Sequence, residues 1–395
     1  MTDTQDTSIT QPKQKTLPLI IAFALGAMLA AIIFAAMPKA SGGTQAGAPT
    51  QGQGTATEQG GPVDIAATFP SWNQDSASLA ELVAFVQDVT DPASKNYREP
   101  AERIATFDMD GTIICEKAPF YLDYMLLLHR VLDDPSHKAE PDVVALCEEI
   151  RTYAMRGEKN SELSPGRRIA IAHEFAGMTP DEFRAYVTDF LDNEPVVGFD
   201  GMTYGQTFYK PMLEVIDYLR ANDFDVWIVS ACEREVSRSV AAKIGIAPDH
   251  VIATDVAFTT TSQGDETPSK YTMEQGESVL LSEPLSSDKC EYNGKVLAIA
   301  REIGSRPLLS FGNSSGDYAM LNYVETSGGM GMLVIADDLE REYGNEKKSA
   351  EQYELVSKES WTSFSMRDDW ATIYGDGVVR TELPNLEEEE LAQAA

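Results

Sequence analysis

Hydrophobic residues recur along this chain with two different spacings, and the order of the spacings predicts its elements. In residues 78–89 and 211–222, apolar residues recur three and four positions apart, which predicts two amphipathic helices. Short, uniformly apolar runs predict buried strands. These runs are residues 103–107, 226–229, 308–311 and 332–335. Strands that alternate with helices indicate an α/β fold with a mostly parallel sheet.

A long helical segment separates the first predicted strand from the helix at 211–222. Within it, Thr179 and Glu182 have the spacing of a capping box, and Pro180 suits the first helical turn. Apolar residues then follow at helical spacing up to Phe190. We therefore expect one α/β core with a helical insertion at about residues 117–208.

A second hydrophobic feature lies near the N-terminus. Residues 17–37 form a run of 21 residues without a charge, long enough to span a bilayer as a helix. A cleaved signal peptide usually has a shorter apolar core, so we expect an uncleaved anchor. Lys13 and Lys15 precede the run and Lys39 follows it, which favours an inside N-terminus. The catalytic part is then expected on the periplasmic or other extracytoplasmic side.

Composition divides the rest of the chain. A stretch rich in Gly, Thr, Gln and Ala predicts a flexible linker, and a run of glutamates near the C-terminus predicts a solvated tail. The expected parts are a polar tail at 1–16, the membrane helix at 17–37, the linker at 38–63, the globular domain at 64–385 and the acidic tail at 386–395.

The formal net charge is −32. A surface this acidic repels phosphate backbones and argues against nucleic-acid binding.

The four cysteines, Cys115, Cys147, Cys232 and Cys290, form no CxxC pair, and buried thiols are the expected state. Cys115 and Cys232 each lie just past a predicted strand. In an oxidising compartment, a disulfide between them is an alternative hypothesis.

Polar residues follow three of the predicted strands. They are residues 108–112, Ser230 and residues 312–317. In open α/β sheets, ligands bind at the carboxyl ends of strands, so these groups are expected to meet in one pocket. Their types suit phosphoryl transfer: a carboxylate attacks phosphorus, a second carboxyl group moves protons, and Mg²⁺ neutralises the site.

These residues resemble the motifs of the haloacid dehalogenase-like superfamily. Residues 107–112 (FDMDGT) are similar to its first motif, Ser230 to its second, and residues 312–317 (GNSSGD) to its fourth. Lys295 is our choice for the third motif, with Lys289 as the alternative. The resemblance implies a Rossmann-like core in which the helical insertion is a cap.

The resemblance also implies a role for each residue. Asp108 is the expected nucleophile and Asp110 the expected general acid and base. The implied Mg²⁺ ligands are Asp108, Asp110 (through its carbonyl), Asn313 and Asp317. The implied phosphate contacts are Thr112, Ser230, Ala231 and Lys295.

A closer resemblance, over about residues 100–375, is to bacterial hydrolases near the phosphoserine and phosphorylcholine phosphatases. The segments that carry it are 209–212, 218–222, 311–317, 340–343 and 365–370. In that group the cap closes over a small phosphomonoester substrate. The candidate cap residues here are Glu116, Phe120, Tyr121, Arg167 and Arg168. We expect structural roles for residues 340–343 and 361–374.

Two departures from the family pattern bear on function. Asn313 stands where many members have an aspartate, and Ala231 and Cys232 stand where close relatives tend to have glycines. Asp110 argues against the metal-independent dehalogenases, and a single hydrophobic span excludes a P-type pump. The prediction is a Mg²⁺-dependent phosphomonoesterase with an aspartyl-phosphate intermediate. A phosphotransferase and a non-catalytic, membrane-tethered binding protein remain as alternatives, and the oligomeric state stays open.

Overall fold

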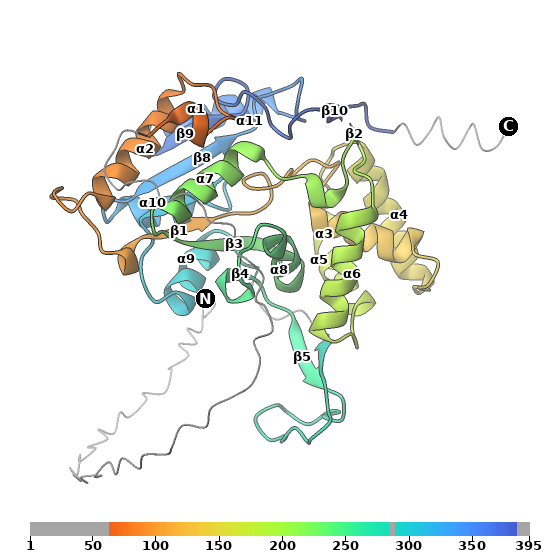
Figure 1. Cartoon of the computed structure of the whole chain (residues 1–395). Coiled ribbons are helices and arrows are strands. Elements are labelled where there is room, and N and C mark those ends of the chain that lie inside the picture. Colours follow the sequence, from red (N-terminus) through yellow and green to blue (C-terminus); the bar gives the residue numbers. More distant parts are fainter. Residues whose placement is uncertain (1–62, 284–288, 385–395) are drawn as a thin grey trace, which may run out of the picture. The chain divides into compact units, whose positions relative to one another are not determined.

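The core of the protein is a six-stranded sheet in which every neighbouring pair is parallel (Figure 1). The structure, a computed structural model, describes residues 63–283 and 289–384. The strand order is β4-β3-β1-β7-β8-β9, which confirms the predicted α/β class. The strands are β1 (Ile104–Phe107), β3 (Asp225–Glu233), β4 (Val251–Thr254), β7 (Leu309–Gly312), β8 (Met330–Ile335) and β9 (Thr362–Ser365).

All four predicted strands are present, with one notable difference in length. The predicted strand ended at Ser230, whereas β3 continues to Glu233, and its pairing with β4 shifts between Val229 and Glu233. Ser230 therefore lies inside the strand rather than at its end. The strands β4 and β9 were not predicted.

Strand β1 lies in the middle of the sheet because successive strands are added first on one side of it and then on the other. After β1 the chain builds β3 and β4 on one side, and then returns to place β7, β8 and β9 on the other. Such a switch point opens a crevice at the carboxyl ends of the strands. Asp108 follows β1 directly and therefore lies at this crevice.

Helices cover both faces of the sheet. Ile228 belongs to the hydrophobic cluster that holds α2 (Ala77–Thr90) and α7 (Lys210–Ala221). Val229, the next residue, belongs to a separate cluster with α9 (Asn293–Glu302) and α10 (Tyr318–Glu325). Successive strand side chains point to opposite faces, so the two clusters lie on opposite sides of β3. The remaining core helices are α1 (Ile65–Thr68), α8 (Arg234–Lys243) and α11 (Glu346–Val356).

The predicted helical insertion is present between β1 and α7. Its helices are α3 (Leu122–Leu128), α4 (Pro141–Met155), α5 (Ser164–Glu174) and α6 (Pro180–Asn193). The capping box is formed as predicted: the Thr179 hydroxyl accepts the Glu182 N–H at 3.2 Å, and the Glu182 carboxylate accepts the Thr179 N–H at 2.8 Å. We call residues 117–208 the cap segment. Short turns complete the described elements: η1 (Pro100–Glu102), η2 (His129–Asp133), η3 (Ser161–Leu163), η4 (Tyr204–Gln206) and η5 (Pro248–His250).

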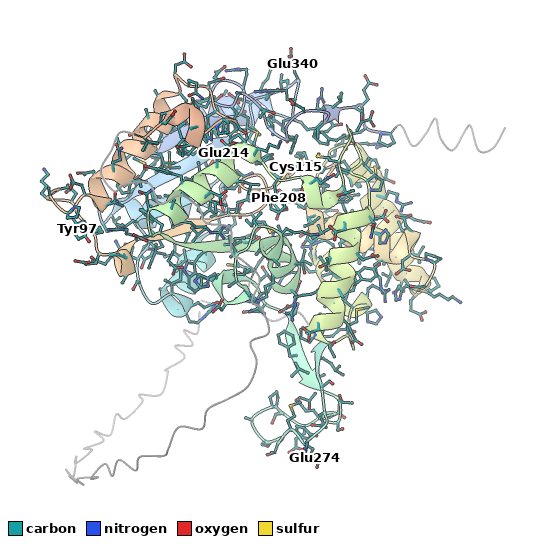
Figure 2. All side chains as sticks on the ribbon, viewed as in Figure 1. Tyr97, Cys115, Phe208, Glu214, Glu274 and Glu340 are labelled. Carbon is teal, nitrogen blue, oxygen red and sulfur yellow. The ribbon has the colours of Figure 1, made fainter. Side chains whose placement is uncertain are left out.

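Two small antiparallel sheets lie outside the main sheet, and neither was predicted. The hairpin of β5 (Ala257–Thr260) and β6 (Val279–Ser282) extends away from the core, with Glu274 in the loop at its tip (Figure 2). The other sheet pairs β10 (Val379–Arg380) with β2 (Phe199–Asp200). It attaches the C-terminal part of the described chain to the cap segment.

The predicted membrane segment at 17–37 lies outside the described residues, as do the polar N-terminal tail, the acidic tail and nearly all of the linker. Within residues 63–283 and 289–384, no helix is long and apolar enough to cross a membrane.

The hypothesis of a Cys115–Cys232 disulfide was wrong for this structure, because all four cysteines are free and buried. The Cys115 thiol lies 3.5 Å and 3.6 Å from the two carboxylate oxygens of Glu342. Cys232 instead lines the cavity beside Asp108. Cys115 and Phe208, labelled in Figure 2, mark the two chain crossings between the core and the cap segment.

Candidate active site

The loop after β1 brings the predicted nucleophile to the crevice. The Asp108 N–H donates to the carbonyl of Phe311 at 2.9 Å, which fixes Asp108 beside the end of β7. Gly111 has φ +80°, and a Cβ there would lie only 1.8 Å from Nδ2 of Asn313, so this turn requires glycine. The buried Thr112 hydroxyl donates to Asp108 at 3.3 Å. Thr112 therefore orients the nucleophile in this structure.

Lys295, the predicted third-motif residue, is fully buried against the nucleophile. Its Nζ lies 2.5 Å from Oδ1 of Asp108, 2.7 Å from Oδ1 of Asp317 and 2.7 Å from the carbonyl of Val229. Only 1 % of Lys295 is exposed. Lys289, the alternative, also lines the cavity but pairs with Glu291. The structure thus places Lys295, and not Lys289, on Asp108.

The group of Asp108, Asp317 and Lys295 holds two carboxylates and one ammonium in a buried place. Burial raises the pKa of Asp108 to about 7, and Asp317 also raises it, while Lys295 opposes both effects. Burial lowers the pKa of Lys295, but the two carboxylates outweigh this and raise it above its ordinary value. The lysine is therefore charged, and when both carboxylates are ionised the group carries one net negative charge, which favours a further cation.

Asp110 lies in the same cavity as Asp108. Its Oδ1 is buried and has no hydrogen-bond partner among the described residues. Burial raises the pKa of Asp110 well above its ordinary value, and the nearby carboxylates of Asp123, Asp108 and Glu116 raise it further. A carboxyl group that keeps its proton beside a nucleophile is suited to donate that proton to a leaving group.

The fourth motif forms a tight loop after β7. Oδ2 of Asp317 accepts the N–H groups of Asn313 and Ser314, each at 3.0 Å, and its Oδ1 accepts Lys295. Both Asp317 oxygens are therefore engaged in holding the loop and the lysine. Nδ2 of Asn313 donates to Glu116 at 2.9 Å, which leaves the Asn313 amide oxygen for another contact.

The second motif differs from the expectation. Ser230 is fully buried within β3, and its Oγ accepts the Cys232 N–H at 3.1 Å. Ala231 and Cys232 line the cavity, whereas Ser230 does not. The physical reason is the continuation of β3 past Ser230, which turns the serine inward.

The cap segment supplies part of the cavity wall. Of the cap candidates, Glu116, Tyr121 and Arg167 line the cavity, whereas Phe120 and Arg168 do not. Phe120 packs edge-on against the ring of Tyr121, with centroids 4.9 Å apart.

Sequence reasoning missed five lining residues, which are Asp123 and Tyr124 of α3 together with Lys159, Ser164 and Glu291. Asp123 forms a buried ion pair with Arg167, whose guanidinium carbon lies 4.4 Å from the centre of the Tyr124 ring. Charged residues do not recur at helical spacing in α3, so the sequence did not indicate which side of this helix faces the cavity.

The donor atoms around Asp108 fit a magnesium ion in their chemistry. Mg²⁺ prefers oxygen ligands. Here the Asp108 carboxylate, the Asp110 carbonyl and the free amide oxygen of Asn313 are the candidates, next to the excess negative charge described above. Asp317 has both oxygens engaged and would act through its charge. Among the residues that the structure describes, this site included, no group of three or more His, Cys, Asp or Glu side chains is arranged to hold a metal, so the candidate ligands here include a backbone carbonyl and an amide oxygen.

Comparison with known structures gives distant similarities. A conserved protein of unknown function from Anaerococcus prevotii is 14% identical, with a TM-score of 0.46, over 73% of this chain and 91% of that one. A phosphoserine phosphohydrolase-like protein from Francisella tularensis is 16% identical, with a TM-score of 0.35, over 66% and 94%. A hydrolase from Salmonella enterica serovar Typhi is 15% identical, with a TM-score of 0.35, over 67% of both chains. A comparison with curated proteins gave no match.

A family model gives the decisive similarity. The model of haloacid dehalogenase-like hydrolases matches residues 105–322, which are more than half of the chain. The match begins in β1 and includes the loop of Asp108, the cap segment, Lys295 and the fourth motif. The resemblance found in the motifs is confirmed, and the chain belongs to the haloacid dehalogenase-like hydrolase family.

Proposed function

We propose that this protein is a Mg²⁺-dependent phosphomonoesterase that acts on a small phosphorylated metabolite through an aspartyl phosphate on Asp108. The contact between Lys295 and Asp108 carries the proposal. A fully buried lysine holds one oxygen of Asp108 at 2.5 Å, in a cavity that Asp110 also lines. A positioned carboxylate beside a second, proton-bearing carboxyl group is the arrangement that covalent phosphoryl transfer needs.

The reaction has two steps in this proposal. First, an Asp108 oxygen bonds to phosphorus while the bond from phosphorus to the leaving oxygen breaks, and Asp110 gives its proton to that oxygen. Second, water attacks phosphorus, Asp110 accepts a proton from the water, and the bond from phosphorus to Asp108 breaks to release phosphate. Asp108, the Asp110 carbonyl and Asn313 would hold Mg²⁺, whose positive charge would offset the repulsion of Asp108 and the phosphate. Lys295 and the Ala231 N–H are the proposed phosphate contacts.

The test uses the purified full-length chain and an aryl phosphate. We expect hydrolysis in Mg²⁺ and a return to background in EDTA, with recovery when Mg²⁺ is restored. Asp108→Asn removes the nucleophile and should abolish turnover, while rapid quenching of the wild type should trap an acid-stable phosphate on residue 108. Full activity in EDTA, or an active Asp108→Asn variant, contradicts the proposal. Transfer of phosphate to added glycerol would identify the phosphotransferase alternative.

We also propose that residues 17–37 anchor the protein in the membrane with the catalytic part on the extracytoplasmic side. The support is the length of the uncharged run and the lysines that flank it. Carbonate-washed membranes should retain the protein, and protease added to spheroplasts should remove the catalytic part. Recovery of the whole chain in the soluble fraction would refute the anchor.

A further inference from the structure

The active-site cavity shares part of its wall with a second, larger cavity. The inner one, of about 90 Å³, contains Asp108 and Asp110, and the outer one is about 540 Å³. Both are lined by Glu116, Tyr121, Lys159, Glu291, Ser314 and Gly316. A phosphoryl group on Asp108 would fill much of the inner cavity, so the rest of a substrate must lie at this shared boundary or beyond it.

The direction of the leaving group follows from the chemistry. In an in-line attack the leaving oxygen lies opposite Asp108, and it must also reach the carboxyl group of Asp110. Asp110 and Glu116 both line the inner cavity, and Glu116 also lines the outer one. The leaving group therefore points from the inner cavity toward the boundary residues, including Tyr121 and Lys159.

The charges at this boundary are unequal. The Glu116 carboxylate lies 3.6 Å from the ammonium of Lys348, and Glu291 pairs with Lys289. Lys159 has its Nζ 5.5 Å from the centre of the Tyr121 ring, and no carboxylate of the described residues lies within ion-pair distance of it. Glu116 and Glu291 are thus each paired with a lysine, whereas the exposed ammonium of Lys159 has no carboxylate partner among the described residues and can meet a ligand at this boundary.

A second observation, deeper in the same cavity, points to the same kind of ligand. Arg167 is 4% exposed and gives one terminal nitrogen to Asp123, but its Nε–H has no partner among the described residues. A buried donor without a partner is unfavourable unless a ligand accepts from it. Helix α5 also begins in the cavity wall at Ser164, which brings the positive end of its dipole there.

We propose that Lys159 and the Nε–H of Arg167 form a second anion site, which binds a carboxylate or a second phosphate carried by the leaving group. This inference rests on the proposed phosphomonoesterase function, because it defines the substrate class of the same site. The preferred substrates are then small phosphomonoesters with a second anionic group, rather than those with a neutral leaving group. Both residues are specificity-determining residues in this proposal.

The test compares substrates that differ in one charge. 3-Phosphoglycerate is paired with glycerol 3-phosphate, which lacks the carboxylate, and 1,3-propanediol bisphosphate with the monophosphate, which lacks the second phosphate. The full-length wild type should prefer at least one anionic member by tenfold or more in kcat/KM. Lys159→Met should reduce this preference about tenfold by raising KM for the substrate with the extra anion. It should change kcat/KM for the substrates that lack this anion less than twofold. Lys159→Arg should retain the preference.

Arg167 needs a milder change because Asp123 depends on its charge. Arg167→Lys keeps the ion pair and removes the Nε–H, and should reduce the preference in the same selective way. Lys358→Met is the matched control, since Lys358 lines only the outer cavity and pairs with Glu354 at 2.7 Å. Lys358→Met should leave kcat/KM unchanged for all four substrates.

The outcomes separate this inference from the proposed function. Hydrolysis of the aryl phosphate without any preference between the paired substrates overturns the anion site alone. The anion site is also overturned if Lys159→Met lowers kcat/KM equally for both substrates of a pair. Absence of aryl phosphate hydrolysis overturns the phosphomonoesterase. In that case the Kd values of the same pairs, measured by calorimetry on Asp108→Asn, still decide whether the anion is recognised.

Discussion

At the scale of single residues, one lysine joins the first and fourth motifs, because it contacts an aspartate of each. Lys295 sits between Asp108 and Asp317 and is almost completely buried. Removing one partner from a buried ionic group is costly because the remaining charges lose their compensation. Lys295 should therefore contribute to stability as well as to catalysis, unlike a surface lysine.

We predict that Lys295→Met destabilises the protein by about 3–5 kcal/mol, because Asp108 and Asp317 are left facing each other without a cation. Urea unfolding measures this, and aryl phosphate turnover should fall at least 100-fold, about the effect of losing one strong transition-state contact. Lys289→Met is the control: its ion pair with Glu291 is partly exposed and should contribute less than about 1 kcal/mol. Equal effects of the two changes would contradict the assignment of Lys295.

Asn313 is the second residue whose surroundings permit a prediction. Its amide donates to Glu116, so an aspartate there would face a carboxylate. We expect Asn313→Asp to lower kcat/KM by tenfold or more, and Asn313→Asp with Glu116→Gln to recover most of it. Titration of activity with Mg²⁺ for the wild type, the two single variants Asn313→Asp and Glu116→Gln, and the double variant measures both effects. Turnover that appears only in Asn313→Asp would instead support a non-catalytic protein.

At the scale of elements, the cap segment is tied to the core by the C-terminal part of the described chain. β10 pairs with β2, and the Thr381 N–H donates to the carbonyl of Gly198 at 2.9 Å. The Tyr343 hydroxyl, from the core, donates to this same carbonyl at 2.9 Å and also contacts the carbonyl of Thr381. Tyr343 thus makes a structural contact between the core and the cap segment.

Two glycines provide a matched test of this tie. Gly201 and Gly177 have φ of +88° and +84°, so alanine strains either backbone by a similar amount. A Cβ at Gly201 would lie 2.4 Å from the carbonyl oxygen of Gly377, whereas a Cβ at Gly177 would meet nothing within 4 Å.

We predict that Gly177→Ala costs about 1–2 kcal/mol of unfolding free energy by strain alone, and that Gly201→Ala costs more because β10 is pushed from β2. Hydrogen exchange of the Thr381 amide should rise in Gly201→Ala and not in Gly177→Ala. If exchange is unchanged in both, β10 does not tie the cap.

At the scale of the whole molecule, a buried carboxyl group links the core, the cap crossing and the C-terminal segment. Glu342 is 2% exposed, and it contacts the Cys115 thiol, the Tyr374 hydroxyl and the N–H of Tyr343. Burial raises the pKa of Glu342 to about 7, while the hydrogen bonds from Tyr374 and Tyr343 oppose this shift. The protonation of Glu342 should therefore change the free energy of unfolding of the whole protein.

The sign of the effect follows from proton binding. Between about pH 4.5 and pH 7 the folded protein keeps a proton on Glu342 that the unfolded chain has released, so stability falls as pH rises through this interval. We predict that Glu342→Gln removes this fall, which is on the order of 3 kcal/mol. The measurement is the difference in urea unfolding free energy between wild type and variant from pH 4 to pH 8. A constant difference over this range would show that Glu342 does not titrate there.

The sequence by itself determined the α/β class, four strands of the main sheet, the cap insertion, its capping box and the family. These depend on local patterns: uniformly apolar runs, helical spacing and the short motif at residues 107–112. It also indicated Lys295 as the third-motif residue in preference to Lys289, because Lys295 lies at a predicted helix start and Lys289 lies in a loop rich in Ser and Asp. The short, partly polar run of β9 and the pairing of β10 with β2 gave no local signal, because distant partners create them.

Tertiary structure decided which side chains reach the cavity. Ser230 followed an apolar run, but the extended β3 buries it, and only the fold shows Asp123 and Tyr124 facing Arg167. The two adjoining cavities lie where the cap segment meets the core loops, and Lys159, at their shared wall, has no ion-pair partner among the residues that the structure describes. Local sequence encodes the groups that do the chemistry, whereas contacts between residues far apart in the chain decide what those groups meet.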